Sequence, residues 1–221
     1  MEGRGIKTQN LPIHIGIIPD GNRRWAKKNK IDFFNAYKTG FENLKKILDK
    51  IIDYGIYNAS VYILSYENCT KRNKIELDFL FNLSKEGFNY IRENKKLKDN
   101  DISVKVIGDM SIVPNYILNE IRKTEEETKN RKNGVLNLAY CYSGEWELNL
   151  IKNGERPPSL HMMPMDLLIR TGGVKRISGF FPLLINYAEF YFTDVLWPDF
   201  NENELEKSLN WFSSQPRNFG I

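Results

Sequence analysis

The stretch HIGIIPDGNRRWAKKNK, residues 14–30, changes from apolar to strongly basic within a few positions. The segment from His14 to Pro19 is short and mostly apolar, as expected of a strand that is buried on both faces of a sheet. Asp20, Gly21 and Asn22 follow, and a basic block begins at Arg23. A buried strand that ends in a polar turn and leads into a basic helix is typical of an anion-binding edge of an α/β sheet.

The remaining chain alternates between strand and helix patterns. Apolar residues recur at helical spacing in residues 35–54 and 74–96, and the second of these stripes comprises Ile75, Phe79, Leu80, Leu83, Phe88 and Ile91. Further helices are expected at 114–129 and 201–212, and strands at 59–66, 102–108, 134–142, 166–171 and within 189–200. This alternation predicts an α/β fold with a central parallel sheet flanked by helices. We expect a single domain over residues 1–221, with residues 1–12 flexible.

Composition narrows the class of function. The formal net charge of +4 is modest, and it permits anionic ligands without requiring nucleic acid. Cys69 and Cys141 provide neither a disulfide framework nor a zinc-site spacing, which fits a reducing cytoplasm. No known nucleic-acid module is present, so we expect no nucleic-acid partner.

Three polar clusters follow predicted strands: residues 20–25, 65–72 and 170–178. Because the carboxyl ends of parallel strands meet at one edge of a sheet, we expect the clusters to converge there. Together they carry several cations, hydroxyls and amides but few acids, a combination that suits phosphate or diphosphate. Each cluster also has an ordinary interpretation as a turn, a helix cap or a solvated helix face.

Two acids stand out from their surroundings. Asp20 is a candidate Mg²⁺ ligand, because Mg²⁺ prefers one or two carboxylates together with phosphate oxygens. Residues 20–22 taken alone are more typical of an ordinary turn with a helix cap at Asp20 or Asn22. Glu189 interrupts an apolar run, where a carboxylate needs a cation or a hydrogen-bond donor.

These motifs, with SYEN at 65–68, LLIRTGGVKRISGF at 167–180 and AEFYFTDVLWPDF at 188–200, resemble the cis-prenyltransferases, the family of undecaprenyl and dehydrodolichyl diphosphate synthases. The resemblance runs from about His14 to Gly220. It implies a parallel sheet flanked by helices, a hydrophobic tunnel for the growing chain, and usually a dimer. It also implies Mg²⁺-dependent condensation of an allylic diphosphate with isopentenyl diphosphate, the homoallylic substrate, to a cis-isoprenoid diphosphate.

The resemblance implies a role for each matching residue. Asp20 and Glu189 would bind Mg²⁺, and Asp20 and Asn68 would be catalytic, Asn68 as the proton acceptor. The residues implied in substrate binding are Gly21, Asn22, Arg23, Arg24, Trp25, Phe33, Tyr37, Ser65, Tyr66, Glu67, Cys69, Lys71, Arg170, Arg176, Ile177 and Ser178.

The chain departs from the family pattern at several of these positions. Phe33 and Tyr37 stand where relatives have arginine and histidine, Cys69 replaces a tryptophan, and Lys71, with Arg72 adjacent, replaces an arginine. The segment 146–166 is shortened and is expected to lack a helix. The C-terminal Arg-x-Gly, which in relatives reaches the neighbouring subunit's site, begins here with Asn218.

Three hypotheses follow. The chain is an active prenyltransferase of the usual kind, or a divergent one with an unusual donor, acceptor or bond geometry, or one subunit of a heteromer with a related chain. The first predicts a homodimer. All three place the protein in the cytoplasm, with peripheral membrane association through the product as a further option.

Overall fold

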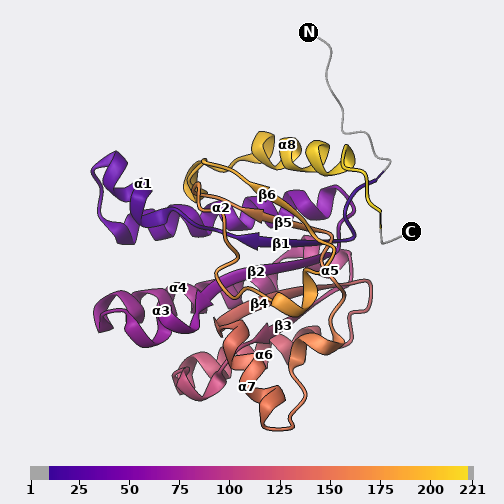
Figure 1. Cartoon of the computed structure of the whole chain (residues 1–221). Helices are drawn as coiled ribbons and strands as arrows, with labels where there is room; N and C mark the ends of the chain where they lie inside the picture. The colour runs from indigo at the N-terminus through magenta and orange to yellow at the C-terminus, as the bar shows by residue number, and fades with distance from the viewer. Residues whose placement is uncertain (1–9, 219–221) are drawn as a thin grey trace.

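The computed structural model describes residues 10–218, which form one six-stranded sheet with all strands parallel in the order β3-β4-β2-β1-β5-β6 (Figure 1). The predicted parallel sheet is therefore confirmed. Its strands are β1 (His14–Ile18), β2 (Asn58–Ser65), β3 (Ile102–Ile107), β4 (Gly134–Tyr142), β5 (Leu167–Arg170) and β6 (Glu189–Phe192).

The described chain contains eight α-helices, of which α8 follows the last strand and the other seven lie between strands. They are α1 (Asn22–Asn29), α2 (Phe33–Asp53), α3 (Tyr66–Lys71), α4 (Lys74–Glu93), α5 (Lys95–Asp99), α6 (Asn115–Thr128), α7 (Gly144–Lys152) and α8 (Glu202–Ser213). Short 3₁₀ turns lie at Met110–Ile112, Pro158–His161, Pro182–Leu184 and Trp197–Asp199. None of the helices in the described part is both long enough and apolar enough to cross a bilayer.

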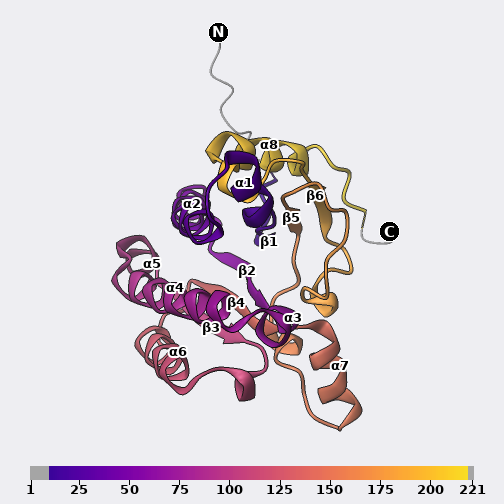
Figure 2. The same cartoon turned by 90° about the vertical axis from the view of Figure 1, so that its left-hand side faces the viewer.

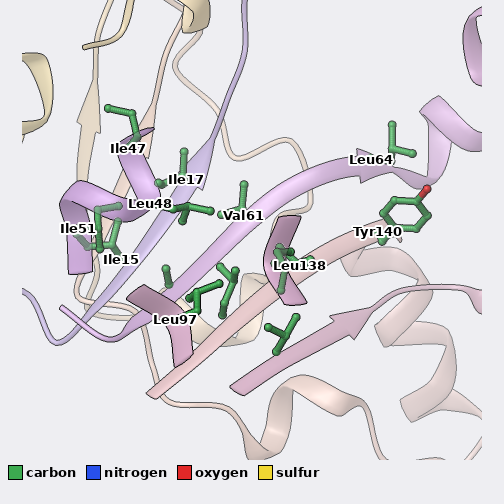
Figure 3. Close-up of a cluster of buried hydrophobic side chains, with 14 of the residues drawn as sticks. Ile15, Ile17, Ile47, Leu48, Ile51, Val61, Leu64, Leu97, Leu138 and Tyr140 are labelled. Atoms are coloured by element: carbon green, nitrogen blue, oxygen red, sulfur yellow. The ribbon is translucent and has the colours of Figure 1, made fainter. Parts of the chain in front are cut away.

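The two faces of the sheet are covered differently. On one face, side chains of α2, α4, α6 and α8 pack against the strands in the larger core cluster, part of which is shown in Figure 3. The other face is covered by residues 177–185 and by Trp146 of the short helix α7. Figure 2 shows the long helices on one side of the sheet and α7 on the other. The second face is thus covered mainly by coil.

The long helix expected over residues 74–96 is interrupted at Asn94. The Asn94 side chain accepts a hydrogen bond of 2.8 Å from the Leu97 amide and caps α5, so the chain turns there. The predicted apolar stripe of this helix is also wrong at its first member, because Ile75 is 73% exposed and Glu76 is buried. The shortened segment 146–166 begins within α7, where no helix was predicted.

The structure describes the N-terminal segment from Asn10 onward. Residues 1–9, part of the segment expected to be flexible, lie outside the described residues. Leu11 packs against the larger core cluster, and Pro12 is buried.

Cys69 and Cys141 form a disulfide, contrary to the expectation drawn from the sequence. They are 72 positions apart in the chain, but β2 and β4 are neighbours in the sheet. Helix α3 begins directly after β2, so Cys69 lies beside Cys141 near the end of β4, with the two Cα atoms 5.6 Å apart. The spacing of the two cysteines along the chain does not indicate this contact, and once paired they give no indication of a reducing compartment.

The disulfide closes a loop in the unfolded chain and so lowers the conformational entropy of the unfolded state. We therefore expect it to stabilise the fold. For a loop of this length the entropic contribution is about 4 kcal/mol. Urea unfolding of the native protein should therefore show a lower free energy of unfolding after addition of dithiothreitol. A Cys69→Ala/Cys141→Ala variant should have the lower free energy of unfolding already without dithiothreitol, and the reductant should not change it. Equal midpoints for the native protein with and without dithiothreitol would contradict this expectation.

Candidate active site

The three polar clusters meet at the carboxyl ends of β2, β1 and β5, which are adjacent strands. They surround a pocket of about 530 Å³. Its wall carries four guanidinium groups and a single carboxylate, that of Asp20; the arginines are Arg23, Arg24, Arg72 and Arg170. This excess of positive charge over a single acid suits the pocket to a multiply charged anion.

Asp20 is held at the centre of this arrangement by both its side chain and its main chain. Oδ1 accepts a hydrogen bond of 2.9 Å from Arg24, and Oδ2 accepts one of 2.9 Å from Arg170. The main-chain oxygen accepts a 2.7 Å hydrogen bond from the Thr171 hydroxyl. A ligand that competes for the two guanidinium groups would release the carboxylate, so Asp20 and an anionic ligand are coupled through the same arginines.

Arg170 and Asn22 each have a buried polar atom that a ligand in the pocket could contact. Arg170 is buried at the end of β5, where it also donates to Ser178 Oγ at 2.8 Å and to the Arg176 carbonyl. Its Nε, however, has no hydrogen-bond partner among the described residues, and neither has Oδ1 of Asn22. Buried polar atoms are rarely left without partners unless a ligand or water supplies them.

Gly21 is required by the backbone between β1 and α1. Its φ of 125° is a conformation that side chains disfavour, and a Cβ there would lie 3.0 Å from the Leu196 backbone. Helix α1, which starts directly after it, has no side-chain cap at its N-terminus. The first amides of α1 are therefore available to an anion.

Helix α3 brings the second cluster to the pocket. Its first turn is capped by Ser65, whose hydroxyl accepts a 3.1 Å hydrogen bond from the Asn68 amide. The Asn68 side chain accepts a 3.0 Å hydrogen bond from Nε of Arg72. Cys69, between these two residues, is tied to β4 by the disulfide. The main chain at Asn68 is thus held by Ser65 and by the disulfide of the next residue, and the side-chain amide is held by Arg72.

A buried carboxylate that the sequence did not indicate lies behind this helix. Glu76 is 1% exposed, and its side chain is contacted by Tyr37, Arg72 and Arg23. Its spacing from Leu80 and Leu83 puts it on the apolar face of α4, and an acid in that register was the available signal. Burial raises the pKa of the Tyr37 hydroxyl, which the nearby Arg72 opposes, so Tyr37 stays protonated near neutral pH and donates to Glu76.

An apolar cavity of about 130 Å³ opens from the pocket between α2 and α4. The two spaces share wall residues, including Pro19, Tyr37 and Leu64. Phe41 packs over Gly87, where an added Cβ would lie 3.2 Å from the ring. The aromatic rings of Phe88 and Tyr140, which also line the cavity, lie 6.1 Å apart. The site therefore combines a cationic mouth with a small apolar interior.

Several predicted substrate-binding residues do not line the pocket. Trp25 donates to Asp199 at 2.7 Å, Phe33 packs on Phe34, and Cys69 is in the disulfide. The remaining ones are the half-buried Tyr66 and Ile177 and the exposed Glu67, Lys71 and Arg176. At the predicted Lys71 position the structure brings Arg72, the next residue, into the pocket.

Glu189 lies apart from Asp20 within the chain. It pairs with Leu167 at the start of β6, and Leu167 pairs with Ile15 at the start of β1. Asp20 follows the other end of β1, roughly 15 Å away at about 3.3 Å per residue. Glu189 borders a separate hollow with Pro216, Arg217 and Asn218. Within one chain the two predicted metal ligands therefore lie at opposite ends of the sheet, and the assignment of Glu189 stays a prediction.

Comparison with known proteins places the site in context. Residues 18–220 match the prenyltransferase family model of undecaprenyl diphosphate synthases. The chain belongs to this family. Membership makes it a prenyltransferase of the isoprenyl diphosphate synthase type, as the sequence motifs indicated.

Two similar relatives differ in the donor that their names specify. A geranylgeranyl-diphosphate-specific tritrans,polycis-undecaprenyl-diphosphate synthase of Aeropyrum pernix is 36% identical over 95% of this chain and 98% of its own. A farnesyl-diphosphate-specific ditrans,polycis-undecaprenyl-diphosphate synthase of Buchnera aphidicola is also 36% identical, over 97% of this chain and 93% of its own.

Among solved structures, lavandulyl diphosphate synthase from Lavandula x intermedia, in complex with dimethylallyl diphosphate, is similar with a TM-score of 0.84 and 30% identity. The match covers 96% of this chain and 99% of that one. The names and titles of these similar proteins thus mention three different diphosphates.

Proposed function

We propose that the chain joins an allylic diphosphate to isopentenyl diphosphate and produces a longer isoprenoid diphosphate. The observation that carries this proposal is the cationic pocket around Asp20, which opens directly into an apolar cavity. Such a site accepts a ligand with a diphosphate at one end and a hydrocarbon at the other.

In the proposed reaction the bond between the allylic C1 and the diphosphate oxygen breaks, and C1 bonds to C4 of isopentenyl diphosphate. The C2 proton of the acceptor is then lost, and inorganic diphosphate leaves. Arg23, Arg24 and the α1 amides bind the leaving diphosphate, and Arg170 and Ser178 bind the acceptor's diphosphate. Asn68, held by Arg72, accepts the proton. Such a reaction depends mainly on positioning and on stabilising the charge that develops on the leaving group.

Asp20 suits a Mg²⁺ ion that is shared with the substrate. No group of three or more acids, histidines or cysteines in residues 10–218 forms a complete metal site. Mg²⁺ does not need one, since it is commonly bound by one or two carboxylates and by phosphate oxygens. When bound, it would neutralise charge on the departing diphosphate. The leaving diphosphate would occupy Arg24 and the acceptor's diphosphate Arg170, which leaves the Asp20 carboxylate available to the ion.

Replacing Asp20 by asparagine should remove Mg²⁺-dependent turnover while the fold is kept. The amide retains the shape of the side chain, and the main-chain contact to Thr171 remains. We expect a loss of roughly 100-fold or more in kcat, as for other groups that stabilise developing charge. Turnover is measured with radiolabelled isopentenyl diphosphate, a series of allylic diphosphates and Mg²⁺. Asp78→Asn, at an exposed acid of α4, serves as the control. Wild-type turnover in Asp20→Asn would remove Asp20 from the mechanism.

The size of the apolar cavity favours a short product. A cavity of about 150 Å³ binds a molecule as small as benzene. The cavity here, about 130 Å³, therefore suits about one five-carbon unit. This observation supports the divergent alternative, in which donor and product are shorter than those of the undecaprenyl diphosphate synthases.

Phe41→Ala should lengthen the product. The ring of Phe41 fills the space over Gly87 at the α2–α4 contact, so its removal deepens the cavity. We expect the product distribution to shift by at least one five-carbon unit, as read by chromatography of the dephosphorylated products. Phe79→Ala is the matched control, because Phe79 packs on Phe34 outside the cavity. Identical distributions from wild type and Phe41→Ala would show that Phe41 does not limit the chain.

We also place a homodimer on the thinly covered face of the sheet. Large apolar side chains are exposed within residues 148–190, the part of the chain that includes the coil over this face: Leu148, Ile151, Leu160, Met163, Tyr187 and Phe190. A second copy of the chain would bury them. The proposed location is cytoplasmic, with the apolar product as a contact to the membrane.

Sedimentation velocity should show a dimer for the wild type and a weaker one for Leu148→Glu. Ile75→Glu is the control, because Ile75 is exposed on α4, which packs on the opposite face. A monomer with full turnover would overturn the homodimer. A monomer that gains turnover only with a related chain would favour the heteromeric alternative.

A further inference from the structure

Glu76 has more charged and polar partners than any structural requirement of α4 explains. The Tyr37 hydroxyl donates to Oε1 at 2.9 Å, and Arg72 donates to the same oxygen. Arg23 donates to Oε2 at 3.1 Å. Burying a carboxylate is unfavourable by several kcal/mol before its partners are counted, and an apolar residue would pack on this helix face without that penalty.

The partners of Glu76 all face the pocket, although Glu76 does not. Arg23, Tyr37 and Arg72 line the pocket wall, and they come from α1, α2 and the segment after α3. One buried carboxylate thus ties together three elements that are separate in the chain. Without it, Arg23 and Arg72 would be left as like charges next to one another with no counter-charge between them.

Arg72 extends this arrangement to Asn68. One of its nitrogens is bound at Glu76, and its Nε donates to Asn68 Oδ1 at 3.0 Å. An N–H donor next to the side chain fixes which end of the amide points toward it, because only the oxygen accepts. Glu76, Arg72 and Asn68 form a continuous series from the interior of α4 to the pocket.

From this series we infer that Glu76 is a positioning residue for the reaction. It holds Arg23 and Arg72 at the pocket wall, and through Arg72 it sets the orientation of the Asn68 amide. The inference rests on the proposed function, since it concerns how the proton acceptor is aligned. Phe33 and Tyr37 supply no cation at this flank, so the charge there comes from the two arginines that Glu76 holds.

Positioning has a kinetic signature that differs from that of substrate binding. In Glu76→Gln both arginines remain, but no carboxylate neutralises their positive charge. Their affinity for a diphosphate should therefore be kept or increase slightly. Alignment of Asn68 should be lost, so that kcat falls.

The experiment compares wild type, Glu76→Gln and Glu86→Gln, in which the control residue is an exposed glutamate of the same helix. Steady-state kinetics gives kcat and KM, and calorimetric titration with inorganic pyrophosphate gives a binding constant and the fraction of competent sites. We expect kcat per competent site to fall at least tenfold in Glu76→Gln, with pyrophosphate affinity no weaker than in wild type. Glu86→Gln should match wild type in both.

Arg72→Lys provides a second test in case Glu76→Gln does not fold. Lysine keeps a positive charge opposite Glu76 but lacks the Nε–H that reaches Asn68. We expect kcat to fall severalfold. If Glu76→Gln folds, the double variant should lose less than the product of the two single losses, because both act through one series.

The outcomes separate the inference from the proposed function. No product from the wild type under any donor would overturn both. Product from the wild type with unchanged kcat in Glu76→Gln, or in Arg72→Lys where only that variant folds, would overturn the inference alone. An equal loss of kcat and pyrophosphate affinity would also overturn it, because Glu76 would then serve binding rather than alignment.

Discussion

Strand β1 is hydrogen-bonded to β2 on one side and to β5 on the other, and the site depends on this double pairing. Because all three strands run in the same direction, their carboxyl ends coincide, and three segments far apart in the sequence become neighbours. The register between β1 and β5 determines which side chains meet at this edge. Ile18 pairs with Arg170, so the turn after β1 is placed against the guanidinium that ends β5. A slip of one residue would turn Arg170 to the other face of the sheet.

The pocket also depends on having few acidic side chains near its arginines. Four arginines line the pocket, and the two carboxylates that pair with them, Asp20 in the wall and Glu76 behind it, have different roles. Asp20 is one-third exposed and bound by guanidinium groups that an anion would also attract. Glu76 is buried, and the two arginines that it contacts are held from behind, away from any competing ligand. Ligand binding would thus release Asp20 from its arginines, whereas Glu76 stays bound to its own arginines behind the wall.

The alternation of buried strands and amphipathic helices was sufficient to predict the parallel sheet and the edge at which Asp20, Ser65 and Arg170 meet. Local patterns could not show features that arise from contacts between segments. The Cys69–Cys141 disulfide depends on β2 and β4 being neighbours, which the order of elements alone does not determine. Glu76 occupies an apolar position only because three partners satisfy its charge, so hydropathy selected Ile75 instead.

Glu189 was predicted to be a metal ligand from a motif match alone, and a motif match does not show where a residue lies in the fold. The strand register puts its carboxylate at the amino end of the sheet, where motif order gave no information. Asn94 shows the same limit for helix length. Its side chain is a good cap for the next helix, and a purely apolar periodicity runs past it without a signal.

Asp166, at the amino end of β5, joins both ends of the described chain. Oδ2 accepts hydrogen bonds from the amides of Ile13 and His14, at 2.8 and 3.1 Å, and Oδ1 accepts one of 2.8 Å from Arg217. The chain therefore enters and leaves the fold at one place, on the opposite side of the sheet from the pocket (Figure 1). A linker joined to the chain close to Ile13 or Arg217 would leave from the amino ends of the strands, so the protein can be immobilised or fused with its substrate entrance facing outward.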